Sequence, residues 1–339
     1  KMATPMIGHR GKDASMLQKS ISEKMQKLFY TNNTILLSTS SGTGLMEGSI
    51  RSCTSKKAAV FSCGSFGDRW YKMAVANNVP ADIFKVELGE ATTPEMVDKV
   101  LSTGEYDLIT VTHNETSTGI RNPIEEIGEV VKKYEDVIYC VDTVSSAGGI
   151  KVEVDKIGID ICITSVQKAL GLPPGMSICT FSQKAIDRAK QVPFRGVYLD
   201  LLVMYEYLIK KNYQYPSTPS LSHMFALDFQ LDNILDEGLD NRFNRHEDMA
   251  NLVRNWAKKH FQIFTNENHL SNTLTVIENT QGISVSNLNS KLQERGFQIA
   301  NGYGDLKEKT FRISHMGDYT VEDVQELLDN IDDILGFNK

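Results

Sequence analysis

Short apolar runs alternate with amphipathic segments between residues 34 and 181, and this alternation constrains the fold more than any other feature of the sequence. Such runs, when bounded by turn-forming residues, are typical of buried strands. They lie at Thr34–Ser38, Ala58–Phe61, Ile83–Leu88, Tyr106–Val111, Val137–Val141, Ile159–Thr164 and Met176–Phe181. Most segments between them repeat apolar residues at helical spacing, as at Met46, Ile50 and Cys53. We therefore expect an α/β fold with three layers, a mostly parallel sheet covered by helices on both faces.

After the last of these runs the pattern changes. A loop-rich stretch leads into two long amphipathic segments at residues 224–238 and 240–260, followed by shorter strand-like and helical segments. We expect a large α/β domain over residues 1–234, of which 1–33 form an N-terminal segment. A smaller C-terminal α+β domain is expected over residues 235–339.

The composition argues against several classes of partner. A net charge of −7 gives no basic surface for nucleic acid, and no apolar run is long enough to span a membrane. No secretory signal opens the sequence, although a short piece could precede Lys1. The five cysteines show no metal-binding spacing and mostly fall within strand-like runs, so we expect buried, reduced thiols, no metal site and a cytoplasmic location.

Lys168 follows the predicted strand Ile159–Thr164 and precedes a Gly-Leu-Pro-Pro-Gly turn. A lysine at the end of a buried strand lies near a low-dielectric wall, where it loses its proton more easily. A neutral amine can then condense with a carbonyl group. Taken alone, Lys168 fits an ordinary surface lysine better, and only its expected neighbours favour the chemical role.

Those neighbours also follow predicted strands, where ligands of parallel sheets bind. Residues 40–44, Ser-Ser-Gly-Thr-Gly, open a helix and could hold a phosphate, although an ordinary turn fits equally well. Asp142 could either hold a proton on a cationic heterocycle or cap the next segment. Residues 112–119 bring hydroxyls and a carboxylate to the same edge, and Phe66 could stack on a planar ring. Together with Lys168, these groups describe a site for pyridoxal 5′-phosphate (PLP).

Eight motifs, spread in order over nearly the whole chain, carry a family resemblance. They are MIGHR (6–10), SSGTG (40–44), FGDRW (66–70), HNETSTG (113–119), VDTVSSAGG (141–149), SVQKALGLPPG (165–175), YPSTPS (215–220) and FRISHMG (311–317). The chain resembles the class V PLP-dependent aminotransferases of fold type I, and within them most the alanine–glyoxylate and serine–pyruvate group. The resemblance implies a homodimer with shared active sites that acts on a small-molecule amino acid and a 2-oxo acid.

The resemblance also implies a role for each matching residue. Lys168 would form a Schiff base with the cofactor, Asp142 would pair with the pyridinium nitrogen, and Arg312 would bind the substrate carboxylate. The other cofactor contacts would come from Ser41, Gly42, Thr43, Gly44, Phe66, Thr116, Val144 and Gln167, and, across the dimer interface, from Tyr215 and Thr218. Two departures bear on substrate choice: the family's Pro-Gly-Pro segment is not present, and Leu45 stands where close relatives often carry histidine.

The expected reaction is a ping-pong transamination from alanine or serine to glyoxylate or pyruvate. Transamination of phosphoserine stays open, because His9 and Arg10 belong to a His-Arg-Gly-Lys stretch similar to one in phosphoserine aminotransferases, and aspartate or an aminophosphonate is a further alternative within the same class. These two residues could bind substrate or grip the partner subunit. A class V lyase of the cysteine desulfurase type is less favoured, since Gln167 rather than histidine precedes the lysine. A regulator is disfavoured because the chain leaves no room for a DNA-binding module.

One remaining feature is interpreted as ordinary surface chemistry. Arg242 and Arg245 lie in a charged stretch of the predicted helix over residues 240–260. Charged runs on a helix usually face water, so we expect both guanidinium groups to be solvated.

Overall fold

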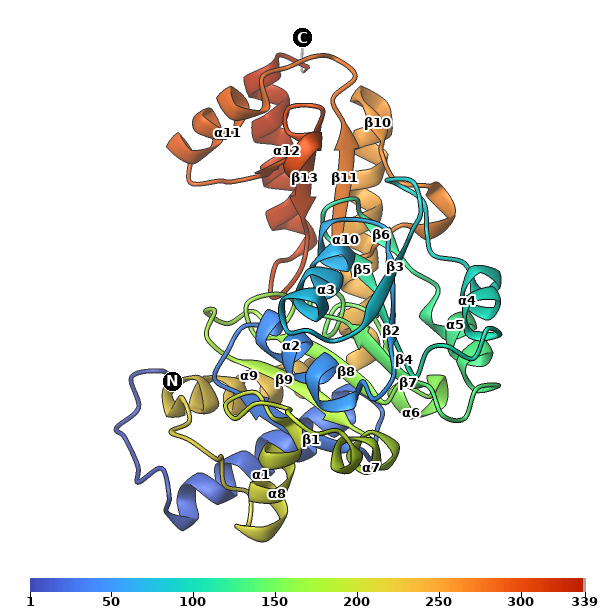
Figure 1. Cartoon of the computed structure of the whole chain (residues 1–339). Coiled ribbons are helices and arrows are strands. Elements are labelled where there is room, and N and C mark those ends of the chain that lie inside the picture. The colour runs from blue at the N-terminus through green and yellow to red at the C-terminus, as the bar shows by residue number, and fades with distance from the viewer. Residues whose placement is uncertain (338–339) are drawn as a thin grey trace.

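The alternating segments form one seven-stranded sheet. In the computed structural model, which describes residues 1–337, the strand order is β1–β9–β8–β7–β4–β2–β3 (Figure 1). The strands are β1 (Thr34–Ser38), β2 (Ala58–Ser62), β3 (Ala81–Lys85), β4 (Leu108–Thr112), β7 (Ile138–Asp142), β8 (Ile161–Ser165) and β9 (Ser177–Phe181). The five strands from β8 to β3 pair in parallel, whereas β9 pairs antiparallel with both β8 and β1. The prediction of a mostly parallel sheet is confirmed.

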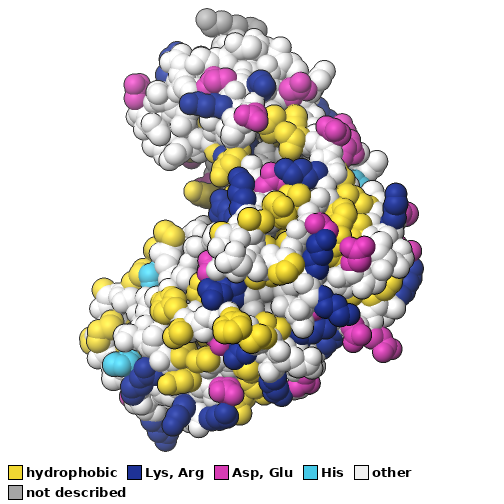
Figure 2. Space-filling view, in the orientation of Figure 1, with side chains coloured by type: hydrophobic (Ala, Val, Ile, Leu, Met, Phe, Trp, Pro, Cys, Tyr) yellow, Lys and Arg dark blue, Asp and Glu magenta, His cyan; other side chains and the backbone are white. Residues whose placement is uncertain are grey.

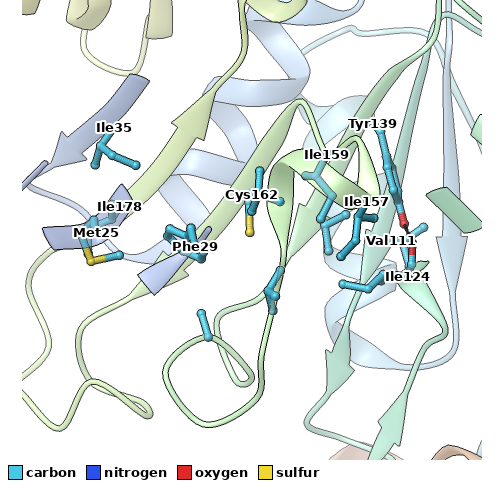
Figure 3. Close-up of a cluster of buried hydrophobic side chains, with 14 of the residues drawn as sticks. Met25, Phe29, Ile35, Val111, Ile124, Tyr139, Ile157, Ile159, Cys162 and Ile178 are labelled. Carbon is cyan, nitrogen blue, oxygen red and sulfur yellow. Dashed lines mark hydrogen bonds between the residues drawn. The ribbon is translucent and has the colours of Figure 1, made fainter. Parts of the chain in front are cut away.

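Helices cover both faces of the sheet, because the strands are apolar on both sides. In β4, Ile109 and Val111 belong to one buried cluster, and the preceding Leu108 belongs to a second. Figure 3 shows part of the first cluster, in which Met25 and Phe29 pack near Ile178. The helices of this lobe are α1 (Lys12–Leu28), α2 (Gly42–Cys53), α3 (Ser65–Ala76), α4 (Pro94–Leu101), α5 (Ile124–Val131), α6 (Val154–Ile157), α7 (Gln183–Gln191), α8 (Leu201–Lys210) and α9 (Leu221–Glu237). The first cluster includes residues of α1, α4, α5 and α9, and the second includes residues of α2, α3, α7 and α8.

A smaller lobe is built around a second, antiparallel sheet with the order β10–β11–β13–β12. Its elements are α10 (Leu239–His260), β10 (Gln262–Ile263), β11 (Leu274–Glu278), α11 (Val285–Glu294), β12 (Ala300–Asn301), β13 (Thr310–Ser314) and α12 (Val321–Leu335). A separate buried cluster, drawn from residues 249–331, fills this lobe. The helix α10 lies beside β11 and α12 but also reaches the larger lobe (Figure 1). The domain boundary near residue 235 stays our proposal.

Several general expectations can be compared with the described residues. All five cysteines are buried and none is in a disulfide. Within residues 1–337, no helix has the length and apolar character needed to cross a membrane. The same part of the chain holds no group of three or more His, Cys, Asp or Glu side chains arranged to bind a metal ion. The cytoplasmic location stays a prediction.

Candidate active site

The site lies between the two lobes. Figure 2 shows the molecule hollowed between its larger and smaller lobes. A cavity of about 800 Å³ is lined by Thr116 and Lys168 of the larger lobe and by Arg312 and Ser314 of the smaller one. The fold therefore places the predicted Schiff-base lysine, Lys168, and the predicted carboxylate-binding arginine, Arg312, in one cavity.

Lys168 follows β8, and its side chain is half-buried. Within residues 1–337 its ammonium group has neither a hydrogen-bond nor an ion-pair partner. Burial lowers the pKa of Lys168, the nearby positive charge of Arg312 lowers it further, and the carboxylate of Asp142 acts in the opposite direction. A larger fraction of this lysine is therefore neutral than of an exposed one, which favours its use as a base or nucleophile.

Asp142 ends β7, the strand next to β8, and is only 4% exposed. Its carboxylate accepts a hydrogen bond from the backbone N–H of Val144 at 2.8 Å. Burial raises the pKa of Asp142 to about 7, and the nearby Glu115 contributes, although the Val144 bond, Arg69 and Lys168 act against the shift. A buried carboxylate of this kind is stabilised as an anion when a cation is placed beside it.

The N-terminus of α2 follows β1, as the predicted phosphate cradle requires. Ser41 caps this helix in an extended conformation, and its side chain makes no capping hydrogen bond. A Cβ on Gly42 would lie 2.7 Å from Cγ2 of Val144, and one on Gly44 would lie 2.6 Å from Oγ of Ser40. Only glycine allows so close an approach at these two positions, and backbone N–H groups at a helix start attract anions.

Two aromatic rings and two guanidinium groups form a row from the larger to the smaller lobe. The guanidinium of Arg69 lies 4.6 Å from the centre of the Phe66 ring, which is 5.8 Å from the ring of Tyr303. The guanidinium of Arg312 lies 5.6 Å from the Tyr303 ring, and Arg69 also donates to Oγ1 of Thr43 at 3.0 Å. Reasoning from sequence gave Arg69 no role, although it lies in the FGDRW motif, and it missed Tyr303, which no local pattern distinguishes from a surface residue.

Arg312 connects the lobes directly. Its Nη1 donates to the backbone carbonyl of Thr116 at 3.2 Å, and its Nε donates to the carbonyl of Asn301 at 3.1 Å. Two other predicted residues lie in the same region. The hydroxyls of Thr116 and Ser145 are 2.6 Å apart, and Oε1 of Gln167 is buried without a partner in the described part of the chain.

The remaining predicted residues do not line this cavity. Arg10 donates to the backbone carbonyls of Tyr215 and Ser217 of its own chain, the latter at 2.9 Å. The hydroxyl of the buried Tyr215 accepts from the backbone N–H of Thr39 at 3.2 Å, close to the predicted phosphate cradle. Two other side chains are exposed: His9 and Thr218. The roles of these residues in substrate binding or across a dimer interface stay predictions.

The expectation that Arg242 is solvated is wrong, because its side chain is 1% exposed. Loops that are distant in sequence cover this face of α10 and supply backbone carbonyls to the guanidinium. Arg245 is half-buried by part of the same cover.

Comparison with known proteins agrees with this geometry. A sequence profile of the family Aminotransferase class-V matches residues 4–327. An uncharacterized aminotransferase of Methanocaldococcus jannaschii is 42% identical over 93% of this chain and 83% of its own length. A serine–glyoxylate aminotransferase of Arabidopsis thaliana is 29% identical over 89% of this chain and 77% of its own. The crystal structure of an alanine–glyoxylate aminotransferase from Nostoc sp. matches with a TM-score of 0.92 and 26% identity, covering 98% of this chain and 90% of that one. With its mostly parallel sheet and an aminotransferase match over nearly all of its length, this chain belongs to the class V aminotransferase family.

Proposed function

We propose that this protein is a PLP-dependent transaminase that moves the amino group of alanine or serine to glyoxylate or pyruvate. The observation that carries the proposal is Lys168, whose ammonium has no partner among residues 1–337 and which shares a cavity with Arg312 and lies near the buried Asp142. The choice of substrates is supported by the similarity to proteins named serine–glyoxylate and alanine–glyoxylate aminotransferases.

The residues of the site fit PLP. Asp142, with its pKa of about 7, suits a cationic ring nitrogen, because the added positive charge would stabilise its anionic form. The start of α2, with Gly42 and Gly44 closely packed, suits a phosphate group. The side-chain oxygen of Gln167, which no other described residue contacts by a hydrogen bond, leaves an acceptor for a further donor. When bound, PLP supplies an aldehyde that condenses with amines and a ring that takes up the electron pair left at the substrate Cα.

The protein's own groups hold the substrate and move its proton. We assign Nζ of Lys168 as the base that removes the proton from the substrate Cα, a task for which its lowered pKa is suited. Arg312 offers a planar pair of donors for the α-carboxylate, which fixes the amino acid at one end. Asp142 keeps the proton on the ring nitrogen, because its carboxylate is buried away from competing water.

We also propose a homodimer in which Tyr215 and Thr218 contribute to the neighbouring site. An apolar surface supports this assembly, since Phe194 is 93% exposed and Val197 is 86% exposed. Figure 2 shows hydrophobic side chains gathered on the larger lobe. Sedimentation velocity of a Phe194→Asp variant should give a monomer, whereas Val75→Asp, on the exposed end of α3, should leave a dimer. A wild-type monomer would contradict the proposal.

Other reactions of the class are less well supported. A desulfurase needs a mobile nucleophilic cysteine, whereas Cys53, Cys63, Cys140, Cys162 and Cys179 are all buried, and burial raises the pKa of each thiol. Phosphoserine transamination would need a second anion site near Lys168, and neither His9 nor Arg10 lines the cavity that Lys168 and Arg312 share.

The test is a screen of half-reactions. Protein loaded with PLP is mixed with single amino acids while the visible absorbance of the bound cofactor is recorded, and a 2-oxo acid is then added. We expect loss of the absorbance with alanine or serine, and its return with glyoxylate or pyruvate. Lys168→Ala should show neither change at a comparable rate. A response only to phosphoserine or aspartate would reject the proposed substrates, and a fully active Lys168→Ala variant would reject the assigned base.

A further inference from the structure

One buried guanidinium connects the segments that carry Lys168 and Asp142. Arg242, near the start of α10, donates from Nη2 to the backbone carbonyl of Ala169 at 2.7 Å, directly after Lys168. Its Nε donates to the carbonyl of Gly148 at 2.8 Å, in the loop that follows Asp142. The two segments therefore share one hydrogen-bond donor side chain.

The same guanidinium also holds the smaller lobe. Its Nη2 lies 3.2 Å from the carbonyl of Gly317 and 3.1 Å from Oδ1 of Asp318, two residues that follow the strand of Arg312. One turn further along α10, Nε2 of His246 accepts a hydrogen bond from the backbone N–H of Gly317 at 3.1 Å. Both backbone groups of Gly317, after β13, therefore bind side chains of α10: its N–H donates to His246, and its carbonyl accepts from Arg242.

Arginine suits this position for a geometric reason. Its planar group presents five N–H donors in fixed directions, whereas lysine has a single flexible ammonium group. The charge is compensated by Glu237, whose carboxylate lies 2.8 Å from Nη1 of Arg242, and by Asp318. Because Arg242 is 1% exposed, water is poorly placed to replace a lost donor.

We propose that Arg242 is a positioning residue of the transaminase site, which fixes the Lys168 segment against the segment that follows Arg312. This inference rests on the proposed roles of those two residues. A substrate bound by its carboxylate to Arg312 must present its Cα to Nζ of Lys168, and the two residues belong to different lobes. Reacting groups displaced by about 1 Å lose on the order of 100-fold in rate, so a rigid connection between the lobes has a catalytic effect.

The first variant is Arg242→Lys, which keeps the charge and loses the planar set of donors. Losing one buried hydrogen-bond donor shifts the equilibrium between the correctly placed and the displaced Lys168 segment by roughly 5- to 150-fold. We therefore expect kcat/KM to fall by about 10-fold or more, with a rise in KM for both the amino acid and the 2-oxo acid.

Arg245→Lys is the matched control. Arg245 also binds Glu237, at 2.7 Å, and the carbonyl of Gly317, at 3.3 Å, but it has no hydrogen bond to Ala169 or Gly148 among the described residues. Its substitution should leave kcat within about threefold of the wild type, because the Lys168 segment keeps its donors.

Hydrogen–deuterium exchange provides a measurement that does not depend on activity or on bound PLP. Arg242→Lys should speed exchange in peptides covering residues 166–172 and 315–320, whereas Arg245→Lys should affect only the second peptide. Unchanged exchange at 166–172 in Arg242→Lys, or an equal loss of kcat/KM in both variants, would overturn the proposal.

If Arg242→Lys fails to fold, Asp318→Asn replaces it, since this carboxylate is more than half exposed and the variant should fold. It should speed exchange at both 166–172 and 315–320, because Asp318 helps to hold the guanidinium of Arg242, and wild-type exchange at 166–172 would reject the inference. Failure of the proposed function has a different signature, because the wild-type protein would then show no half-reaction at all. The exchange data would still report whether Arg242 holds the two segments together.

Discussion

Removing the charge of Asp142 should raise the melting temperature of the PLP-free protein. It should also reduce the increase in melting temperature that PLP binding causes. Burial raises the pKa of this carboxyl from 3.8 to about 7. The folded state therefore holds a proton that the unfolded state releases between pH 4 and 7, and stability falls as the pH rises through this range. A shift of about 3 pKa units corresponds to about 4 kcal/mol, lost in full above pH 7.

The variant for this test is Asp142→Asn, which is neutral at every pH and keeps an oxygen for the N–H of Val144. At pH 8, without PLP, we expect it to melt about 6 °C above the wild type, and at pH 4 the two should melt together. Added PLP should reverse the order, because only the carboxylate pairs with the cationic ring nitrogen, and ligand binding stabilises the folded state. Differential scanning fluorimetry over this pH range, with and without PLP, measures both effects.

A second buried aspartate serves as the control. Asp107 accepts hydrogen bonds from the backbone N–H groups of Ser55, Lys56 and Lys57 and forms an ion pair with Arg188 at 2.8 Å. Asp107→Asn should lower the melting temperature at pH 8, the opposite of the effect expected for Asp142→Asn. If Asp142→Asn without PLP melts no higher than the wild type at pH 8, or if PLP stabilises both equally, the role of Asp142 is refuted.

Three further predictions concern other parts of the site. Arg312→Lys should raise KM for amino and 2-oxo acids by about 10- to 100-fold, because the paired donors are lost; steady-state kinetics with an unchanged KM would contradict this. Gly42→Ala should weaken PLP binding, measured by equilibrium dialysis, because its Cβ would lie 2.7 Å from Val144, and Val144→Ala in the same chain should restore binding. Burial lowers the pKa of His246 to about 4, so this residue should destabilise the wild type, relative to His246→Gln, by about 3 kcal/mol as the pH falls from 6.5 to 4. Urea titrations of both proteins at pH 6.5 and pH 4 measure this difference, and an equal change of stability in both proteins would contradict the prediction.

The sequence by itself determined the central sheet and the chemistry placed at its edge. A strand buried on both faces is mostly apolar along its whole length, so β4, β7 and β8 could be recognised from a few consecutive residues. Parallel strands end at the same edge, so Asp142 and Lys168, each at or just after its strand, could be expected to lie close together. The family motifs added the class of reaction.

Only the tertiary structure decided what covers a given surface. Arg242 lies in a charged stretch of helix, and no local pattern indicates that Gly148, Ala169 and Gly317 would close over it. Tyr303 likewise looks like an ordinary loop residue until the smaller lobe places it against Phe66. Periodicity reports which face of an element is buried by the local pattern of apolar residues, whereas backbone carbonyls from distant loops can bury a charged side chain without leaving any trace in that pattern.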